Sequence, residues 1–565
     1  MTTGTEPGID TATPSFDPAL ADRYVRDGLW RREPLGAALR RAAARRPGHL
    51  ALVTPEVRWT YRELDERTDA VAAGLLAATP LRPGDRMMFQ SGNVAETVVA
   101  YYGAVKAGIV PVCTLPQHGE REIGQLAAHT GARAHLVQAD FRGRDLVASA
   151  QRLAATVPGL DTVIVARGEG ALTLDGIAAL GAAGATAPTA PEIDPDGVVA
   201  FQLSGGTTGL PKVAPRRHPE YAYNARVWAQ ALHLDEASVV LHPLPIMHNA
   251  GIVAALQPAH LTGATFVLPA GADAGEVLAL IAREQVTAMP VVPPAVAIRL
   301  LEHPAARSTD LTSLGQFVIG GQRPSEDLLE RLESELGIAA LQMFGMAEGM
   351  FLYTPPQAPL WVRRSTVGTP ISPADEVRVL EIGGEDEVPD GQIGELACRG
   401  PYTIPGYHRA PAHNATAFTA DGFYRTGDLV TRHVVDGVDY YAIDGRIKDV
   451  INRGAEKIHA EEVEELLVRH PAVRAAALVG MPDPVLGERI CAYLVVDTGT
   501  GTGTDTDGPP SLPGITAFLL EQGLARFKLP ERIEVVEAFP LTNVGKVSKK
   551  DLRADIARKI EEGSS

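Results

Sequence analysis

The sequence is poor in cysteine, in aromatic residues and in long apolar runs. Its 565 residues include only three cysteines, Cys113, Cys398 and Cys491, which lie far apart and form no C-x-x-C pair. We therefore expect neither a disulfide framework nor a zinc knuckle, and we expect the protein to work in a reducing compartment. No apolar run reaches the roughly 18 residues that a transmembrane helix needs. Residues 1–16 lack a basic stretch followed by an apolar one, so we expect no secretory signal and a cytoplasmic protein.

Positive charge is also scarce. Lys and Arg number 52 against 69 Asp and Glu, which gives a formal net charge of −17. This balance argues against a broad surface for nucleic acid or for an anionic membrane, so neither is an expected partner. It leaves room for a single basic pocket that binds the phosphates of a nucleotide.

Short apolar runs alternate with helical patterns along most of the chain. Runs such as RMMFQ, VVAFQLS and QFVIGG lie between segments of helical spacing. The alternation predicts an α/β fold with largely parallel sheets. Thr60 and Glu63 have the T-x-x-E spacing of a capping box, which predicts that a helix begins there.

The character of the sequence changes near residue 445. Residues 444–470 are polar and turn-rich and then become a Glu-rich helical pattern, followed by strand-like runs. Residues 498–514 are a low-complexity segment that predicts a surface loop. We therefore predict three parts, which are a disordered tail (1–15), an N-terminal domain (16–446) and a C-terminal domain (447–565).

The strongest local signal is SGGTTGLPK, residues 204–212, directly after an apolar run. Three glycines and three hydroxyl residues predict a loop whose N–H groups and hydroxyls bind phosphate oxygens, with Lys212 supplying charge. The alternative is a plain surface turn. The segment is not a Walker A loop, because Leu210 and Pro211 stand between Gly209 and the lysine. An ATP-driven P-loop motor is therefore not expected.

This loop resembles the signature of adenylate-forming enzymes, the family of acyl-CoA synthetases, luciferases and adenylation domains. Other segments resemble that family's remaining motifs, in the same order: PIMHN (245–249), FGMAEG (344–349), YRTGD (424–428), GRIKDVINRGAEKIHAEEVE (445–464) and PLTNVGKVSKK (540–550). The chain is most similar to the stand-alone aryl-acid–AMP ligases, which include activators of 2,3-dihydroxybenzoate and salicylate in siderophore synthesis. The resemblance implies a large domain of stacked α/β sheets with a barrel-like subdomain, and a small mobile α+β C-terminal domain.

The resemblance also implies the chemistry. A carboxylate attacks the α-phosphorus of Mg·ATP and yields an acyl adenylate and pyrophosphate, a reaction that needs cations and donors around phosphate oxygens. Lys546 and His248 are the implied catalytic residues, and Glu348 and Thr207 the implied Mg²⁺ ligands. The implied ATP-binding residues are Ser204, Gly205, Gly206, Thr207, Thr208, Gly209, Lys212, Gly345, Met346, Asp428 and Arg446.

A second implied step passes the acyl group to a thiol. Lys448 falls at the hinge of a C-terminal domain that uses two poses in related enzymes. The implied thiolation loop consists of Gly454, Ala455, Glu456 and Lys457. The chain reads GAE where GGE is usual, so Ala455 adds a Cβ either in the path of a phosphopantetheine arm or harmlessly in the loop. The implied acceptor is an aryl carrier protein in siderophore or nonribosomal peptide synthesis, or free CoA.

The implied acid pocket is unusual in size. It consists of Asn249, Ala250, Ala254, Gly320, Gly321, Gln322 and Phe351. Asn249 is neutral where amino-acid-activating relatives carry Asp, which suits an ortho hydroxyl or amino group on an aryl ring. Ala250 and Ala254 are smaller than the residues usual in the aryl-acid subgroup. They predict an acid bulkier than salicylate, such as a substituted hydroxyanthranilate or a bicyclic heteroaryl acid. The alternatives are 2,3-dihydroxybenzoate or salicylate as substrate, an aryl-CoA ligase, and a non-catalytic scaffold.

Overall fold

The computed structural model describes residues 12–184, 193–204, 211–453, 456–483, 486–496, 510–542 and 546–563. Contacts divide the chain into two compact units. The first comprises residues 1–376 and 398–424, and the second comprises residues 377–397 and 425–565. The predicted boundary after Arg446 lies inside the second unit and stays a prediction.

The predicted N-terminal tail lies mostly outside the described residues. Its described part contacts the first unit, since Thr13 Oγ1 lies 2.7 Å from His408 Nδ1. The carbonyl oxygen of Pro14 accepts a hydrogen bond of 2.9 Å from Arg217. Residues 13 and 14 are thus held at the surface of this unit.

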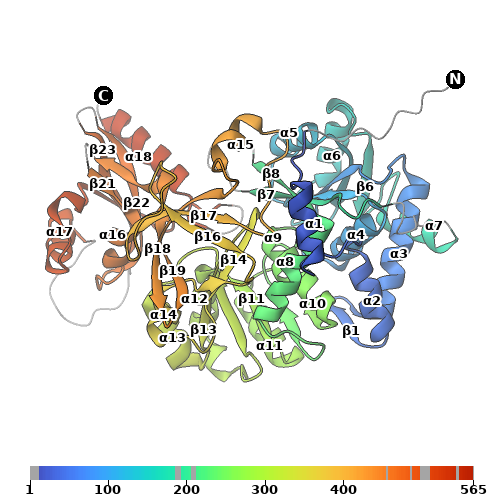
Figure 1. Cartoon of the computed structure of the whole chain (residues 1–565), viewed down its shortest axis with the longest axis horizontal. Coiled ribbons are helices and arrows are strands. Elements are labelled where there is room, and N and C mark those ends of the chain that lie inside the picture. Colours follow the sequence, from blue (N-terminus) through green and yellow to red (C-terminus); the bar gives the residue numbers. More distant parts are fainter. Residues whose placement is uncertain are drawn as a thin grey trace. The chain divides into compact units, whose positions relative to one another are not determined.

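The first unit is built on two sheets of mainly parallel strands (Figure 1). The nine-stranded sheet has antiparallel strands only at its two ends, and the six-stranded sheet has one antiparallel pair, β7 with β8. The predicted α/β fold is confirmed. In spatial order, the nine strands are β15 (Thr369–Pro370), β14 (Gly349–Tyr353), β13 (Ala340–Met346), β12 (Gln316–Gly320), β11 (Ala288–Val292), β9 (Val239–Leu241), β10 (Thr265–Val267), β1 (Leu50–Val53) and β2 (Arg58–Thr60). The six strands are β6 (Thr162–Ala166), β5 (Ala132–Gln138), β3 (Arg86–Gln90), β4 (Val110–Val112), β7 (Val198–Ser204) and β8 (Lys212–Arg217).

Amphipathic helices accompany both sheets. The predicted capping box is present, because Thr60 Oγ1 accepts from the N–H of Glu63 while Glu63 accepts from the N–H of Thr60. Apolar residues of α11, α12 and α13 form one core with strands of the nine-stranded sheet. The helices of this unit are α1 (Pro18–Arg26), α2 (Ala37–Arg45), α3 (Tyr61–Ala78), α4 (Ala95–Lys106), α5 (Glu120–Thr130), α6 (Leu146–Thr156), α7 (Leu174–Ala182), α8 (His218–Ala231), α9 (Asn249–Gly251), α10 (Gln257–Thr262), α11 (Ala274–Glu284), α12 (Pro294–Glu302), α13 (Glu326–Leu336), α14 (Leu360–Ser365) and α15 (Pro411–Ala417).

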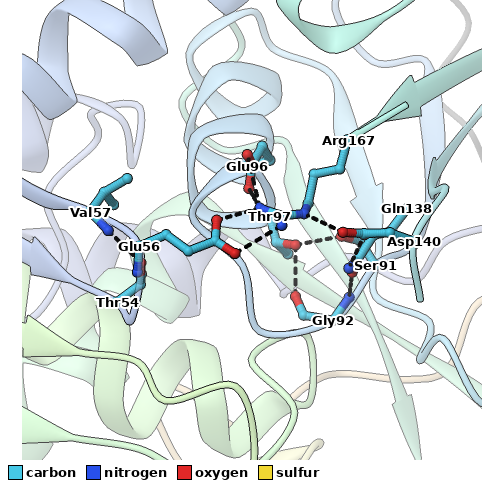
Figure 2. Close-up of polar contacts among 10 residues, drawn as sticks. All are labelled: Thr54, Glu56, Val57, Ser91, Gly92, Glu96, Thr97, Gln138, Asp140 and Arg167. Atoms are coloured by element: carbon cyan, nitrogen blue, oxygen red, sulfur yellow. Dashed lines mark hydrogen bonds and ion pairs between the residues drawn. The ribbon is translucent and has the colours of Figure 1, made fainter. Parts of the chain in front are cut away.

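An ion-pair network around Arg167 connects the two sheets (Figure 2). Arg167 follows β6 and lies in the left-handed backbone region, with φ of 58°. Its two terminal nitrogens donate to Glu56, in the turn between β1 and β2, at 2.6 and 2.8 Å. Its Nε donates to Asp140, which follows β5, at 2.9 Å, and Glu96 of α4 lies 3.4 Å away. One guanidinium therefore bridges segments of both sheets.

The second unit holds a four-stranded sheet and a five-stranded sheet. A separate apolar core forms around α16, α17 and the long antiparallel pair β22 and β23. The predicted Glu-rich helix is α16. The predicted surface loop extends too far, because Leu512–Gly514 already begin α17, capped by Ser511. The elements are β16 (Glu376–Leu380), β17 (Ile393–Arg399), β18 (Tyr424–Val435), β19 (Val438–Arg446), β20 (Ile451–Arg453), β21 (Glu456–Ile458), β22 (Val473–Asp483), β23 (Gly487–Val496), β24 (Arg532–Val535), α16 (Ala460–Leu467), α17 (Leu512–Glu521) and α18 (Lys549–Gly563).

Across the described part of the chain, each helix is too short or too polar to span a membrane.

Candidate nucleotide and acid site

Three of the predicted site segments follow parallel strands of the nine-stranded sheet. The strands β9, β11, β12 and β13 are neighbours and run in the same direction. His248 and Asn249 come after β9, Gly320–Gln322 come at the end of β12, and Gly345–Glu348 come at the end of β13. Because the carboxyl ends of parallel strands share one edge, these segments lie along the edge where ligands bind in α/β sheets.

Asn249 makes the direct contact between two of these segments. Its Nδ2 lies 3.3 Å from the carbonyl oxygen of Met346, and its Oδ1 accepts a hydrogen bond of 2.9 Å from Tyr221. His248 precedes it as the N-cap of α9, and its Nδ1 accepts from the N–H of Ala250 at 3.3 Å. The proton of a neutral His248 ring therefore sits on Nε2. Sequence reasoning missed Tyr221, which lies 28 positions from Asn249.

The chain after Asn249 forms an irregular helix that the sequence did not predict. Residues Ile252–Leu256 have the wide turns of a π-helix, a rare form that is frequent at functional sites. Ala254 lies within it and is fully buried, and its carbonyl oxygen accepts from the Trp228 indole at 3.0 Å. Ala250 is only partly buried. Phe351 packs edge-to-face on Trp228, with ring centroids 5.4 Å apart. Trp228 therefore supports both Ala254 and Phe351, a role that sequence reasoning did not assign.

The predicted glycines lie where the backbone passes close to other groups. Gly321 has a φ of +87°, which favours glycine, and it is exposed. A Cβ on Gly320 would lie 2.6 Å from the sulfur of Met343, and a Cβ on Gly345 would lie 2.8 Å from the Phe351 ring. Gln322 is half-buried next to them. At Gly320 and Gly345, on this edge of the nine-stranded sheet, there is thus no room for a side chain.

Glu348 is a buried carboxylate that accepts a hydrogen bond from the Tyr407 hydroxyl. The hydroxyls of Tyr407 and Tyr424 are 2.8 Å apart. The ammonium of Lys212 lies 5.1 Å from the centre of the Tyr407 ring. Burial lowers the pKa of Lys212, and the charge of Glu348 opposes that shift. The predicted phosphate lysine and the predicted metal carboxylate therefore share one environment.

The second unit contains its own cluster of predicted residues. Asp428 and Arg446 are paired across β18 and β19, with Arg446 Nε 2.7 Å from Asp428 Oδ1. Burial lowers the pKa of Lys546 to about 8, and the charge of Arg446 adds to that effect. Burial likewise lowers the pKa of Lys448, with Arg446 adding to it, and raises the pKa of Asp428 against the charge of Arg446. The buried carboxylate of Asp428 is thus paired with Arg446 and feels the charges of Lys448 and Lys546, an arrangement that suits phosphate or carboxylate oxygens.

Some predicted residues lie outside the described part of the chain. They are Gly205, Gly206, Thr207, Thr208, Gly209, Gly454 and Ala455. The first five lie between Ser204 and Lys212, which pair across β7 and β8. Glu456 and Lys457 belong to β21. The roles assigned to these residues stay predictions.

A cavity of about 280 Å³ lies elsewhere in the first unit. Residues of α2, α8 and α10 line it, including Arg41, Arg45 and Arg226. None of the predicted site residues lines this cavity, so it is separate from the predicted site.

Two protein-family models match the chain. The one described as "AMP-binding enzyme" matches residues 39–408. The one described as "AMP-binding enzyme C-terminal domain" matches residues 462–546.

Curated relatives match over nearly their whole length. Pyochelin synthase PchD of Pseudomonas aeruginosa is 41% identical, covering 99% of this chain and 98% of the relative. The salicylyl-CoA synthase / salicylate adenylyltransferase of a Streptomyces species is 40% identical, covering 95% of this chain and 96% of the relative. The 2,3-dihydroxybenzoate-AMP ligase of Bacillus subtilis is 38% identical, covering 96% and 97%. Among solved structures, apo MbtA of Mycobacterium smegmatis matches with a TM-score of 0.71 at 37% identity, covering 96% of this chain and 98% of that one.

Proposed function

Because the chain belongs to the family of AMP-binding enzymes, we propose that it uses ATP to convert an aryl carboxylic acid to an aryl adenylate and pyrophosphate. The membership confirms the predicted resemblance to adenylate-forming enzymes. The observation that carries the proposal is the contact between Asn249 and Met346. It joins the predicted acid pocket to the predicted nucleotide segment at one edge of a parallel sheet.

The neutral side chain of Asn249 supports an acid without an α-ammonium group. An amino acid bound there would lack a counter-ion for its positive charge. The names of two relatives, which refer to 2,3-dihydroxybenzoate and to salicylate, also favour an aryl acid. The small side chains of Ala250 and Ala254 support an acid larger than salicylate, and Gln322 is the proposed polar contact to its ring.

The remaining site residues are proposed to bind ATP. Lys212 binds the outer phosphates, and Asp428 accepts hydrogen bonds from the ribose hydroxyls. Lys546 binds the acid's carboxylate and the α-phosphate, with Arg446 beside it. Glu348 is a buried carboxylate whose described hydrogen bond comes from a neutral tyrosine, so it fits a hard cation. It would hold Mg²⁺ together with phosphate oxygens, and the bound ion would neutralise phosphate charge.

The proposed acceptor is the phosphopantetheine thiol of an aryl carrier protein in siderophore or nonribosomal peptide synthesis. A second candidate is free CoA, which is favoured by the name of the salicylyl-CoA synthase among the relatives. We place the reaction in the cytoplasm, because all three cysteines are free thiols, as is usual in a reducing compartment.

The test of the activity is acid-dependent exchange of pyrophosphate into ATP. The panel contains salicylate, 2,3-dihydroxybenzoate, bicyclic heteroaryl acids, amino acids and fatty acids. We expect exchange with aryl acids alone, and strongest with the bicyclic ones. Strongest exchange with salicylate would keep the enzyme class and refute the wider pocket. Exchange with no acid would refute the proposed function. Thioester formation with CoA or with an acidic carrier protein then identifies the acceptor.

A further inference from the structure

Four residues form a continuous hydrogen-bond relay that passes through Asn249 of the proposed acid pocket. Gln202 of β7 donates through Nε2 to the hydroxyl of Tyr221 at 3.0 Å. That hydroxyl donates to Asn249 Oδ1 at 2.9 Å, and Asn249 Nδ2 donates to the carbonyl oxygen of Met346. Gln202, Tyr221 and Asn249 are each at most 5% exposed. The relay therefore runs from the strand that leads into the predicted phosphate loop to the segment before Glu348.

The relay has only one consistent direction. The carbonyl oxygen of Met346 can only accept, so the NH₂ group of Asn249 has to face it. The Oδ1 atom of Asn249 must then face Tyr221, whose hydroxyl accepts from Gln202 and keeps its proton for Asn249. A flipped amide would set two acceptors against each other at Met346 and would remove the acceptor for the hydroxyl proton of Tyr221, which leaves buried polar groups unsatisfied.

Tyr221 is itself held rigidly. Its ring is fully buried, and the guanidinium of Arg216 lies 4.5 Å from the ring centre. Arg216 is fixed in turn by Glu220, at 2.6 Å, and donates to the carbonyl oxygen of Ala347 at 2.9 Å. Burial raises the pKa of Tyr221 well above its ordinary value, so its hydroxyl stays protonated and remains a donor. The two carbonyls before Glu348 are thus held by Asn249 and Arg216, with Tyr221 between them.

We propose that Tyr221 is a positioning residue that fixes Asn249 as a hydrogen-bond donor toward the acid, so that the enzyme selects aryl acids with an acceptor atom ortho to the carboxylate. The inference rests on the proposed function. An amide nitrogen carries two hydrogens, of which Met346 takes one. The other is available to the substrate, while one of the two lone pairs of Oδ1 is already taken by Tyr221.

The donor role of Asn249 distinguishes between the ortho-hydroxy, ortho-amino and bicyclic acids that the sequence left as alternatives. In an ortho-hydroxy acid the phenolic proton bonds to its own carboxylate, and the oxygen remains free to accept from Asn249. The ring nitrogen of a bicyclic 2-carboxylate is also an acceptor. An ortho-amino group presents a second N–H, and its lone pair is delocalised into the ring, so two donors would face each other. The enzyme should therefore disfavour anthranilates.

The experiment compares two pairs of acids of nearly equal shape. The pairs are salicylate with anthranilate, and quinoline-2-carboxylate with 2-naphthoate, each differing in the atom at the ortho position. In ATP–pyrophosphate exchange, the wild type should favour the first member of each pair by at least tenfold in kcat/KM. Tyr221→Phe keeps the ring over Arg216 and removes only the hydroxyl. It should lower both ratios about tenfold, mainly through KM for the favoured acids.

The matched control is Tyr223→Phe on the same helix. Tyr223 is also buried, and its hydroxyl lies 2.7 Å from Ser372 Oγ, outside the relay. This control should leave both ratios unchanged. If Tyr221→Phe does not fold, Asn249→Asp replaces it, because a carboxylate lacks the donor and should reverse the preference toward anthranilate.

The outcomes distinguish the proposed role of Tyr221 from the proposed activation of aryl acids. Equal use of salicylate and anthranilate by the wild type would overturn the proposed role of the relay in selecting the acid. The proposed activation of aryl acids would not be affected. An equal loss for both acids in Tyr221→Phe would do the same, because it would mark a merely structural effect. No exchange with any aryl acid would refute the proposed function, and the relay's role would fall with it.

Discussion

The protonation of Lys546 should set the upper pH limit of adenylation. Its proposed role requires the ammonium form, which attracts the oxygens of the carboxylate and the α-phosphate. Burial and the charge of Arg446 lower its pKa to about 8. The protonated fraction is then about 90% at pH 7 and about 10% at pH 9, whereas an unperturbed lysine would stay about 95% protonated at pH 9. Activity should therefore fall as the pH rises through 8.

The assay is the pH profile of the exchange rate with ATP and acid both held well below their KM values, because the rate then reports ionisations of the free enzyme. Lys546→Arg should be slower but should lose the fall near pH 8, since a guanidinium stays charged. Lys550→Arg, at an exposed position of α18, is the matched control and should keep the fall. Arg446→Ala should move the fall to higher pH, because it removes the second cause of the shift. A wild-type profile that is flat to pH 10, or an unchanged fall in Lys546→Arg, would refute this reasoning.

Three further predictions concern the first unit. Arg216→Met leaves Glu220 as a buried charge without its partner, so it should lower the free energy of unfolding by roughly 3–5 kcal/mol; a loss below about 1 kcal/mol in urea denaturation would contradict the buried pair. Arg167→Ala removes a partly exposed network and should lower the free energy of unfolding by only about 1 kcal/mol, with kcat/KM unchanged. Glu348→Gln should raise the Mg²⁺ concentration needed for half-maximal exchange at least tenfold, and a titration with an unchanged midpoint would exclude Glu348 as the metal ligand.

Local signals in the sequence predicted much of the architecture. The alternation of short apolar runs with segments of helical spacing predicted the α/β fold. The T-x-x-E spacing at Thr60 predicted the start of α3. Both depend on interactions between residues close in the chain, which a sequence displays directly. The end of the low-complexity segment was placed too late, because Ser511 caps α17 within a stretch of turn-forming residues.

Ordered motifs carry the residues proposed for the site, so the sequence could name them, and their roles stay predictions. Their supporting residues were not predictable in the same way. Tyr221, Trp228 and Arg216 all fall on or beside one helix, α8, and each looks like an ordinary residue of a helical pattern. Nothing in that pattern indicates which carbonyl or amide each one meets.

The sequence alone predicted the reaction class and the residue types proposed for the site, since both rest on motifs of a few adjacent residues that resemble those of a known family. It left open whether Asn249 offers a donor or an acceptor, because an asparagine side chain contains both. Only the tertiary structure decided that question. The polarity depends on Met346 and Tyr221, which are 97 and 28 positions away, and only folding brings their atoms within hydrogen-bond distance.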